Sequence, residues 1–445
     1  MTTSTQSRRT VRVASTATPD TQTHERKRLS ALSLVAGLIG NVLEWYDFGL
    51  YGYLAPLIAA RFFPAHNVIL SLIAAYAGFA IGFAMRPIGA LVFGHIGDRL
   101  GRRTVLVMSV TLMGLATTAI GLLPNYQMVG FWAPVLLLLV RLFQGFSVGG
   151  EFTGSVSYLI ETAPANRRGY AGSYANIGSS GGYLIAAGLA AITMALISEH
   201  PSFGWAWRLP FLGGGVIAAL ALWLRQRLPM SAYEPDEPAK GEPLPLVKAF
   251  RRSPRIMVLV MLFTWGYGVV NYLTMVFLAT FASRFGTIAP ADALTLNTVA
   301  EAVAIIVVPA AGFLSDVTWR RRTLLLLAFG LFLFAAYGFF RLAIYPTLVA
   351  FAAAQLGFGA MLGVVMGIAP AMLAEAFHAE FRLSGYSLAF NFGLGLGGGT
   401  APLIATALID ASGVTLAPAF YLMFGSLMAM IALYFMPDRS REPLL

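Results

Sequence analysis

The chain has 445 residues, of which 58% are hydrophobic and only 11% are charged. Soluble domains carry about 25% charged residues, so this composition excludes a soluble protein and indicates a polytopic membrane protein. The net charge of +10 does not indicate nucleic-acid binding, because Lys and Arg gather in the two tails and in alternate loops, and the lack of cysteine excludes thiolate metal sites.

Residues 1–30 are polar and basic and contain no apolar core of a signal peptide. We interpret them as a disordered cytoplasmic tail. Two roles stay open for this tail, namely attraction to anionic lipid and simple solvation.

Apolar runs of roughly 20 residues or more then recur along the chain, which is the length that crosses a bilayer as a helix. They predict an all-α integral membrane protein with twelve transmembrane helices. The predicted spans are 31–59, 69–93, 104–123, 132–159, 170–198, 208–227, 255–283, 294–315, 323–341, 346–374, 383–408 and 415–436. The even number and the distribution of Lys and Arg place both termini in the cytoplasm.

A proline-rich stretch of mixed charge separates the first six spans from the last six. It predicts a cytoplasmic linker at 228–254 between an N-terminal bundle, 31–227, and a C-terminal bundle, 255–436. Residues 437–445 form a second cytoplasmic tail.

The two halves repeat each other. Gly94–Arg103 follows the second span and Gly312–Arg322 follows the eighth, with Asp98 and Asp316 at matching positions. Further matching positions about half a chain apart are Glu161 with Glu375 and Asn176 with Asn391. Parallel repeats of this kind, with a site between them, are typical of many secondary transporters.

The first span carries Glu44 and Asp47, which share one helix face that Tyr51 extends. A charge at the centre of a bilayer costs roughly 3 kcal/mol, so such residues either pair or function. With a nearby Arg they can exchange protons as access alternates. The alternative is a static ion pair that holds spans one and four together.

Arg141 and Gln144 lie one turn apart in the fourth span. Arg141 can bind a substrate carboxylate, hold Glu44 or Asp47, or share both roles. Arg86 can face the same pore, or form a structural pair with Asp47 or Glu151. Glu151, among glycines, is a gate or a packing residue.

Charged loop residues after spans two and eight predict gates that bridge to helix ends in one conformation and release in the other. Their alternative role is to fix topology. We expect Glu161 to pair with Arg167 and Arg168, and Glu375 with Arg382. The gate candidates are Asp98, Arg99, Arg102, Arg103, Glu151, Glu161, Arg168, Asp316, Glu375 and Arg382.

Polar residues inside the second-half spans either contact substrate or join helices. Glu301 shares a face with Asn297 and is a candidate second titrating site, or a cation-binding group opposite the arginines. The candidate substrate-binding residues are Tyr51, Arg86, Arg141, Gln144, Asn176, Tyr267, Asn271, Glu301, Gln355 and Asn391.

Residues 31–436 resemble the major facilitator superfamily, through Gly94–Arg103, and within it the metabolite:proton symporter family. The motifs that match are Gly40–Gly52, Arg86–Gly89 and Arg141–Glu151. That family includes proline/betaine, citrate, α-ketoglutarate and shikimate carriers. In the second half, Val317 and Trp319 replace the Arg and Gly of the family pattern, which weakens the second gate motif.

The resemblance implies a proton as coupling ion, with Glu44, Asp47 and Arg141 carrying the coupling, and no other cofactor or metal. We expect a monomeric, multi-pass protein of the bacterial inner membrane that is neither an enzyme nor a nucleic-acid binder. It would import a small polar metabolite by alternating access. Two inward arginines favour an organic acid of the di- or tricarboxylate type; a proline/betaine zwitterion or non-coupled facilitation is the alternative.

Overall fold

The computed structural model describes residues 31–100, 102–148, 151–227 and 245–444, and side chains only within 40–93, 107–148, 152–224 and 248–444. The predicted tail 1–30 and most of the linker lie outside the described residues. The helices of the first half are α1 (Ala31–Tyr53), α2 (Ala55–Phe62), α3 (Val68–Ala84), α4 (Arg86–Leu100), α5 (Arg102–Leu122), α6 (Tyr126–Val129), α7 (Trp132–Ser147), α8 (Glu151–Thr162), η1 (Ala165–Arg167), α9 (Arg168–Glu199), η2 (Pro201–Phe203) and α10 (Arg208–Arg227). Those that follow are α11 (Pro245–Arg252), α12 (Pro254–Asn271), η3 (Tyr272–Phe277), α13 (Leu278–Arg284), α14 (Pro290–Val317), α15 (Arg321–Ala343), α16 (Leu348–Glu375), α17 (Arg382–Gly397), α18 (Ala401–Ser412) and α19 (Ala417–Phe435).

The twelve-span, all-helical prediction is confirmed, because every predicted span contains one helix or a helix divided into two or three segments. In the described part of the chain, nine spans are long and apolar enough to cross a membrane, and α5 and α10 contribute shorter apolar helices. In three of the divided spans, the helix after the break has proline as its second residue, namely Pro56, Pro87 and Pro402. Proline lacks a backbone N–H and fits the first turn of a new helix.

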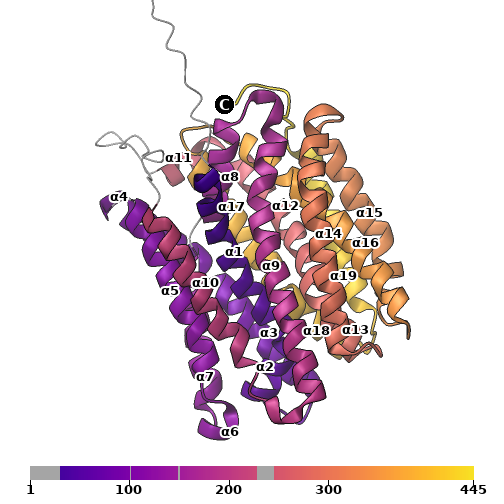
Figure 1. Cartoon of the computed structure of the whole chain (residues 1–445). Coiled ribbons are helices and arrows are strands. Elements are labelled where there is room, and N and C mark those ends of the chain that lie inside the picture. Colours follow the sequence, from indigo (N-terminus) through magenta and orange to yellow (C-terminus); the bar gives the residue numbers. More distant parts are fainter. Residues whose placement is uncertain (1–30, 101, 149–150, 228–244, 445) are drawn as a thin grey trace, which may run out of the picture.

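The first-half and second-half helices stand side by side, and α9 runs along α14 where the halves meet (Figure 1). Helix α3 likewise contacts α18 across this boundary. Near the end of the bundle where the C-terminus lies, a Cβ on Gly312 would come within 2.8 Å of the Gly169 carbonyl oxygen. Only small residues allow two helix backbones to approach so closely.

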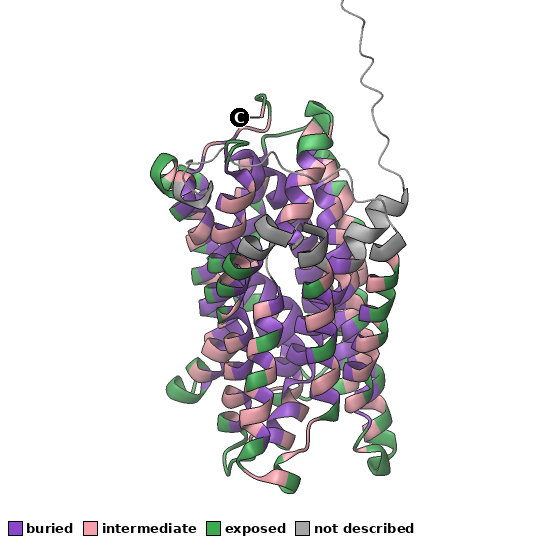
Figure 2. Cartoon of the chain, turned by 90° about the vertical axis from the view of Figure 1, so that its left-hand side faces the viewer, coloured by how far each residue is buried: buried purple, intermediate pink, exposed green. Residues whose placement is uncertain are grey.

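The buried residues lie inside the bundle, and intermediate and exposed residues lie on its outer surface (Figure 2). Large apolar side chains are exposed there, such as Phe334 at 85% and Val349 at 80%. A continuous apolar exterior fits contact with lipid chains, where there is no water to penalise it.

The linker is less extended than expected, because its last part forms the short helix α11 and α12 already begins at Pro254. In α11, Arg252 Nη1 lies 2.8 Å from Glu380 Oε2, an exposed ion pair that fastens this helix to the second half. The exact bounds of the two bundles stay a prediction.

Candidate functional site

Helix α1 presents its two buried carboxylates to two different arginines. Glu44 forms an ion pair with Arg86, which opens α4, and Asp47 faces Arg141 of α7. These four side chains are at most 2% exposed. Acidic and basic groups from the first, second and fourth spans therefore meet in the middle of the protein, as the sequence indicated for the first and fourth.

Asp47 is enclosed by partners from the first half. Its Oδ1 accepts hydrogen bonds from Thr117 Oγ1 at 2.7 Å and Gln144 Nε2 at 2.5 Å. Arg141 Nη1 donates to Gln144 Oε1 at 2.8 Å and lies 3.8 Å from Asp47 Oδ2. The Arg141 guanidinium also lies 4.2 Å from the ring centre of Tyr51. This arrangement leaves Asp47 Oδ2 without a hydrogen-bond donor. Thr117 was missed, since a threonine in an apolar span gives no distinctive signal.

Arg86 faces the second half instead. Its Nε donates to Asn391 Oδ1 of α17 at 3.2 Å. The expected alternatives for a structural partner were Asp47 and Glu151; the first is wrong, since Arg86 pairs with Glu44, and the side chain of Glu151 lies outside the described residues. Arg86 is thus an intramembrane cation that already reaches across the boundary.

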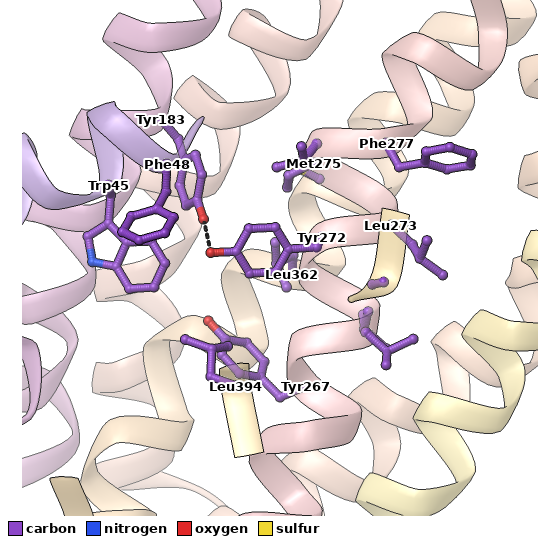
Figure 3. Packing of buried hydrophobic residues seen from close by; sticks show 14 of the residues in the cluster. Trp45, Phe48, Tyr183, Tyr267, Tyr272, Leu273, Met275, Phe277, Leu362 and Leu394 are labelled. Carbon is purple, nitrogen blue, oxygen red and sulfur yellow. Dashed lines mark hydrogen bonds between the residues drawn. The ribbon is translucent and has the colours of Figure 1, made fainter. Parts of the chain in front are cut away.

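Aromatic side chains from both halves pack together at the boundary, among them Trp45, Tyr183 and Tyr272 (Figure 3). Trp45 of α1 lies 5.5 Å from Arg86 and 5.5 Å from the ring centre of Tyr183 of α9. The Tyr183 hydroxyl donates to the Tyr272 hydroxyl across the boundary at 2.8 Å. Tyr272 begins η3, a π-helical turn, and such turns are frequent at functional sites. Trp45 and Tyr183 were not predicted as site residues, although a tyrosine in the middle of the fifth span was a usable signal.

Some polar residues of the second half join helices to one another, and others face the boundary between the halves. Gln355 Nε2 donates to Asn297 Oδ1 at 2.7 Å and to the Thr274 carbonyl at 3.1 Å. From the first half, Asn176 Nδ2 of α9 donates across the boundary to the Met366 carbonyl of α16 at 2.6 Å.

Two more of the predicted substrate residues are buried near these contacts, Asn271 at 2% exposure and Tyr267 at 6%. Tyr267 and Asn176 line a pocket between the halves with an empty volume of about 220 Å³, which includes space open to solvent. Glu301 accepts a hydrogen bond from Tyr53 of α1 at 3.3 Å.

Ion pairs join the halves at the C-terminal end of the bundle, and they cross over. Arg382 of α17 lies 2.6 Å from Glu161 of α8, and Arg168 of α9 lies 3.1 Å from Glu375 of α16. The expected pairs, Glu161 with Arg167 and Arg168 and Glu375 with Arg382, are wrong because each glutamate instead takes an arginine from the opposite half. Local sequence spacing could not reveal this exchange.

The second copy of the gate motif forms its bridges in spite of its altered sequence. Arg321 Nη2 lies 2.7 Å from Asp316 Oδ1, and Arg321 Nη1 lies 2.6 Å from Glu375 Oε2. The Asp316 carboxylate also accepts the backbone N–H groups of Gly169 and Tyr170, both at 2.8 Å, at the start of α9. A helix N-terminus favours a carboxylate. Arg321 was not among the predicted residues, although it belongs to the repeated basic loop.

The side chains of the first copy, Asp98, Arg99, Arg102 and Arg103, lie outside the described residues. The C-terminal segment adds to the same end, since Arg168 Nη2 donates to the Glu442 carbonyl at 2.6 Å. Burial alone would raise the pKa of Asp438, but hydrogen bonds from Ser440 and the Arg322 N–H hold that pKa below its ordinary value.

A sequence profile described as Major Facilitator Superfamily matches residues 37–316. The chain belongs to the major facilitator superfamily. It is 34% identical over 414 residues to a putative proline/betaine transporter of Staphylococcus aureus (strain COL), covering 91% of this chain and 87% of that one. It is 32% identical over 434 residues to the shikimate transporter of Escherichia coli (strain K12), covering 94% and 96%.

These relatives are two of the carrier types in the branch that the sequence resembles, so that resemblance is confirmed. They are transporters, which confirms the prediction that this superfamily member is not an enzyme. A crystal structure of a D-xylose–proton symporter matches with a TM-score of 0.70 over 93% of this chain and 99% of that one. At 16% identity, that likeness shows the fold alone.

Proposed function

We propose that this transporter is a proton symporter for a small metabolite with one carboxylate group, a zwitterion of the proline/betaine kind. The observation that carries the proposal is the pair of separate carboxylate–arginine contacts in the membrane interior. One, Asp47–Arg141, is enclosed in the first half, and the other, Glu44–Arg86, borders the second half.

The enclosed pair suits proton coupling. Asp47 Oδ2 has no hydrogen-bond donor and lies 3.8 Å from Arg141, so a proton can bind there without displacing a donor. Protonation removes the counter-charge of Arg141, and deprotonation restores the attraction. The energy of the cluster therefore depends on the proton, which is the differential interaction that a coupled conformational change requires.

The pair at the boundary suits the substrate. Arg86 Nη1 has no hydrogen-bond partner, and its guanidinium is already held by Glu44 and Asn391. The free Nη1 of this cation can donate a charge-assisted hydrogen bond to a carboxylate. We infer that a substrate carboxylate docks here.

This charge balance limits the number of negative charges that the substrate can carry. In the described mid-membrane region each arginine already has a carboxylate beside it, and one bound proton releases only one positive charge. A di- or tricarboxylate, which the sequence favoured, would bring two or three negative charges into this low-dielectric site. The relatives named for proline/betaine support the smaller charge and the alternative that the sequence left open.

A second candidate substrate is a hydroxylated monocarboxylate without an ammonium group. The specific support is the shikimate transporter, which matches over 96% of its own length. Both candidates share the single carboxylate and the proton, and they differ in whether the substrate carries a positive group.

Transport would proceed by alternating access. The crossed ion pairs hold the C-terminal end closed in this conformation and would separate when that end opens. With both termini in the cytoplasm of a bacterial cell, as the distribution of Lys and Arg predicts, the closed end faces inward.

Proton movement tests this proposal directly. Glycine betaine, proline or shikimate is added outside lightly buffered proteoliposomes, and both the external pH and the uptake of labelled substrate are recorded. We expect the external medium to become more alkaline as the substrate enters, and a protonophore to abolish the pH change. Entry of labelled substrate with no pH change would show a non-coupled facilitator instead.

A further inference from the structure

Glu301 is a buried carboxylate that lacks a cationic partner. It is 1% exposed in the middle of α14, and among the described residues no Lys, Arg or His nitrogen lies within 4.0 Å of its carboxylate. Its hydrogen bond comes from the neutral hydroxyl of Tyr53 at 3.3 Å. An isolated carboxylate in a low-dielectric interior is costly unless it meets a positive charge or a proton. The other ion pairs of the described residues do not involve Glu301, so a cationic ligand or a proton is needed to balance its charge.

The face of α14 that carries Glu301 leads to a pocket between the halves. Pro290 and Leu294 line that pocket together with Tyr53. Residues 290, 294, 297 and 301 follow the spacing of one helix face, so Asn297 and Glu301 continue the line inward from the pocket. Tyr53 therefore both lines the pocket and donates a hydrogen bond to Glu301.

Two unsatisfied polar atoms lie beside this face, one on α14 and one on the neighbouring α16. Asn297 Nδ2 and Gln355 Oε1 are buried and have no hydrogen-bond partner. Buried polar groups are nearly always hydrogen-bonded, so such exceptions need an explanation. A polar ligand between α1, α14 and α16 would supply the missing partners.

Aromatic rings connect this carboxylate to the arginine at the boundary. The Arg86 guanidinium lies 5.5 Å from the Trp45 ring, Trp45 lies 5.5 Å from Tyr183, and Tyr183 lies 6.4 Å from Tyr53. Tyr53 in turn donates to Glu301. The row has the Glu44–Arg86 ion pair at one end and Glu301 at the other, with aromatic rings between them. The aromatic faces next to Glu301 favour an ammonium group.

We propose that Glu301 and Tyr53 bind the positively charged ammonium group of the substrate and thereby select zwitterions over simple carboxylates. This inference rests on the proposed transport function. Arg86 lies beside Glu44 and Glu301 beside Tyr53, and these two α1 residues are nine apart, about 13 Å along the helix, so a small zwitterion would meet Arg86 and Glu301 one after the other. The rings of Tyr53 and Tyr183 would border the ammonium group at Glu301.

Two probes of the same shape separate the effect of the substrate's positive charge from the effect of its shape. Glycine betaine and 3,3-dimethylbutyrate have the same shape, but a neutral carbon replaces the quaternary nitrogen in the latter. Binding of each is measured by calorimetry on the purified full-length protein, for the wild type, Glu301→Gln and Asp292→Asn. Asp292 is an exposed acid at the start of the same helix and serves as the matched control.

We expect the wild type and Asp292→Asn to bind glycine betaine at least about tenfold more tightly than 3,3-dimethylbutyrate, since a quaternary ammonium is attracted by a carboxylate and by aromatic faces and its neutral isostere is not. In Glu301→Gln the two affinities should become similar, mainly through weaker binding of glycine betaine. Retained binding of 3,3-dimethylbutyrate shows that this variant is folded, and Glu301→Asp should recover part of the preference.

Two results would overturn the assignment. The first is an unchanged preference for glycine betaine in Glu301→Gln, and the second is a wild type that does not distinguish the probes. A wild type that moves protons with shikimate but shows no preference for the ammonium group would refute this inference and leave proton symport standing. Loss of proton movement with every monocarboxylate would instead refute the proposed function.

Discussion

At the scale of single residues, the two arginines of the membrane interior have different surroundings, and this difference decides their roles. Arg141 contacts partners in the first half, whereas Arg86 reaches Asn391 in the second. The sequence predicted that Glu44, Asp47 and Arg141 would meet. It could not assign the pairs, because Glu44 and Asp47 lie on one face and either arginine was within reach.

Arg86→Lys should weaken substrate binding roughly 10- to 100-fold, because the guanidinium meets Glu44, Asn391 and a substrate carboxylate with three separate nitrogens and a lysine ammonium has only one. Calorimetry with glycine betaine measures this loss. Arg252→Lys is the control, because the Arg252–Glu380 pair is exposed and should contribute little. Equal affinities for both variants would argue against a substrate role for Arg86.

At the scale of helices, the spans were predictable and their close contacts only partly so. The apolar runs predicted the spans, and in the structure prolines mark three of their breaks. The π-helical turn at Tyr272–Phe277 was not predictable, because it arises from the packing of α12 and carries no composition of its own. The same holds for the hydroxyl contact between Tyr183 and Tyr272.

Gly145→Ala should lower thermal stability, because a Cβ there would lie 1.8 Å from the Gly82 carbonyl oxygen and push α7 away from α3. Overpacking of this kind typically costs about 1–3 kcal/mol. The matched control is Gly330→Ala in α15, where an added Cβ meets nothing within 4 Å. Thermal unfolding in detergent should show a lower midpoint for Gly145→Ala alone; the same midpoint in both variants would contradict the close packing of α3 on α7.

At the scale of the whole molecule, crossed ion pairs close one end and a polarised aromatic row occupies the middle. The repeat of the two halves was visible in the sequence, and so were the four residues of the crossed ion pairs, although Arg321 was missed. The exchange of partners between Glu161 and Glu375 was not, since it depends on how the two bundles dock.

Glu375→Gln should loosen the closed end, because Glu375 binds Arg168 of the first half and Arg321 of the second. The chain contains no cysteine, so a single thiol placed by Tyr386→Cys in the pocket between the halves reports access without interference. We expect maleimide labelling to become several-fold faster with Glu375→Gln. Glu380→Gln, which removes an exposed pair within one half, should leave the rate unchanged. Equal rates in both backgrounds would mean that the crossed pairs do not hold this end shut.

The most direct test of the central claim is uphill accumulation of glycine betaine in proteoliposomes under an imposed pH gradient, acid outside, with the wild type and Asp47→Asn compared. The buried Asp47–Arg141 pair predicts accumulation by the wild type, and none by Asp47→Asn, which should still exchange internal for external substrate. Accumulation by Asp47→Asn equal to that of the wild type would contradict the account.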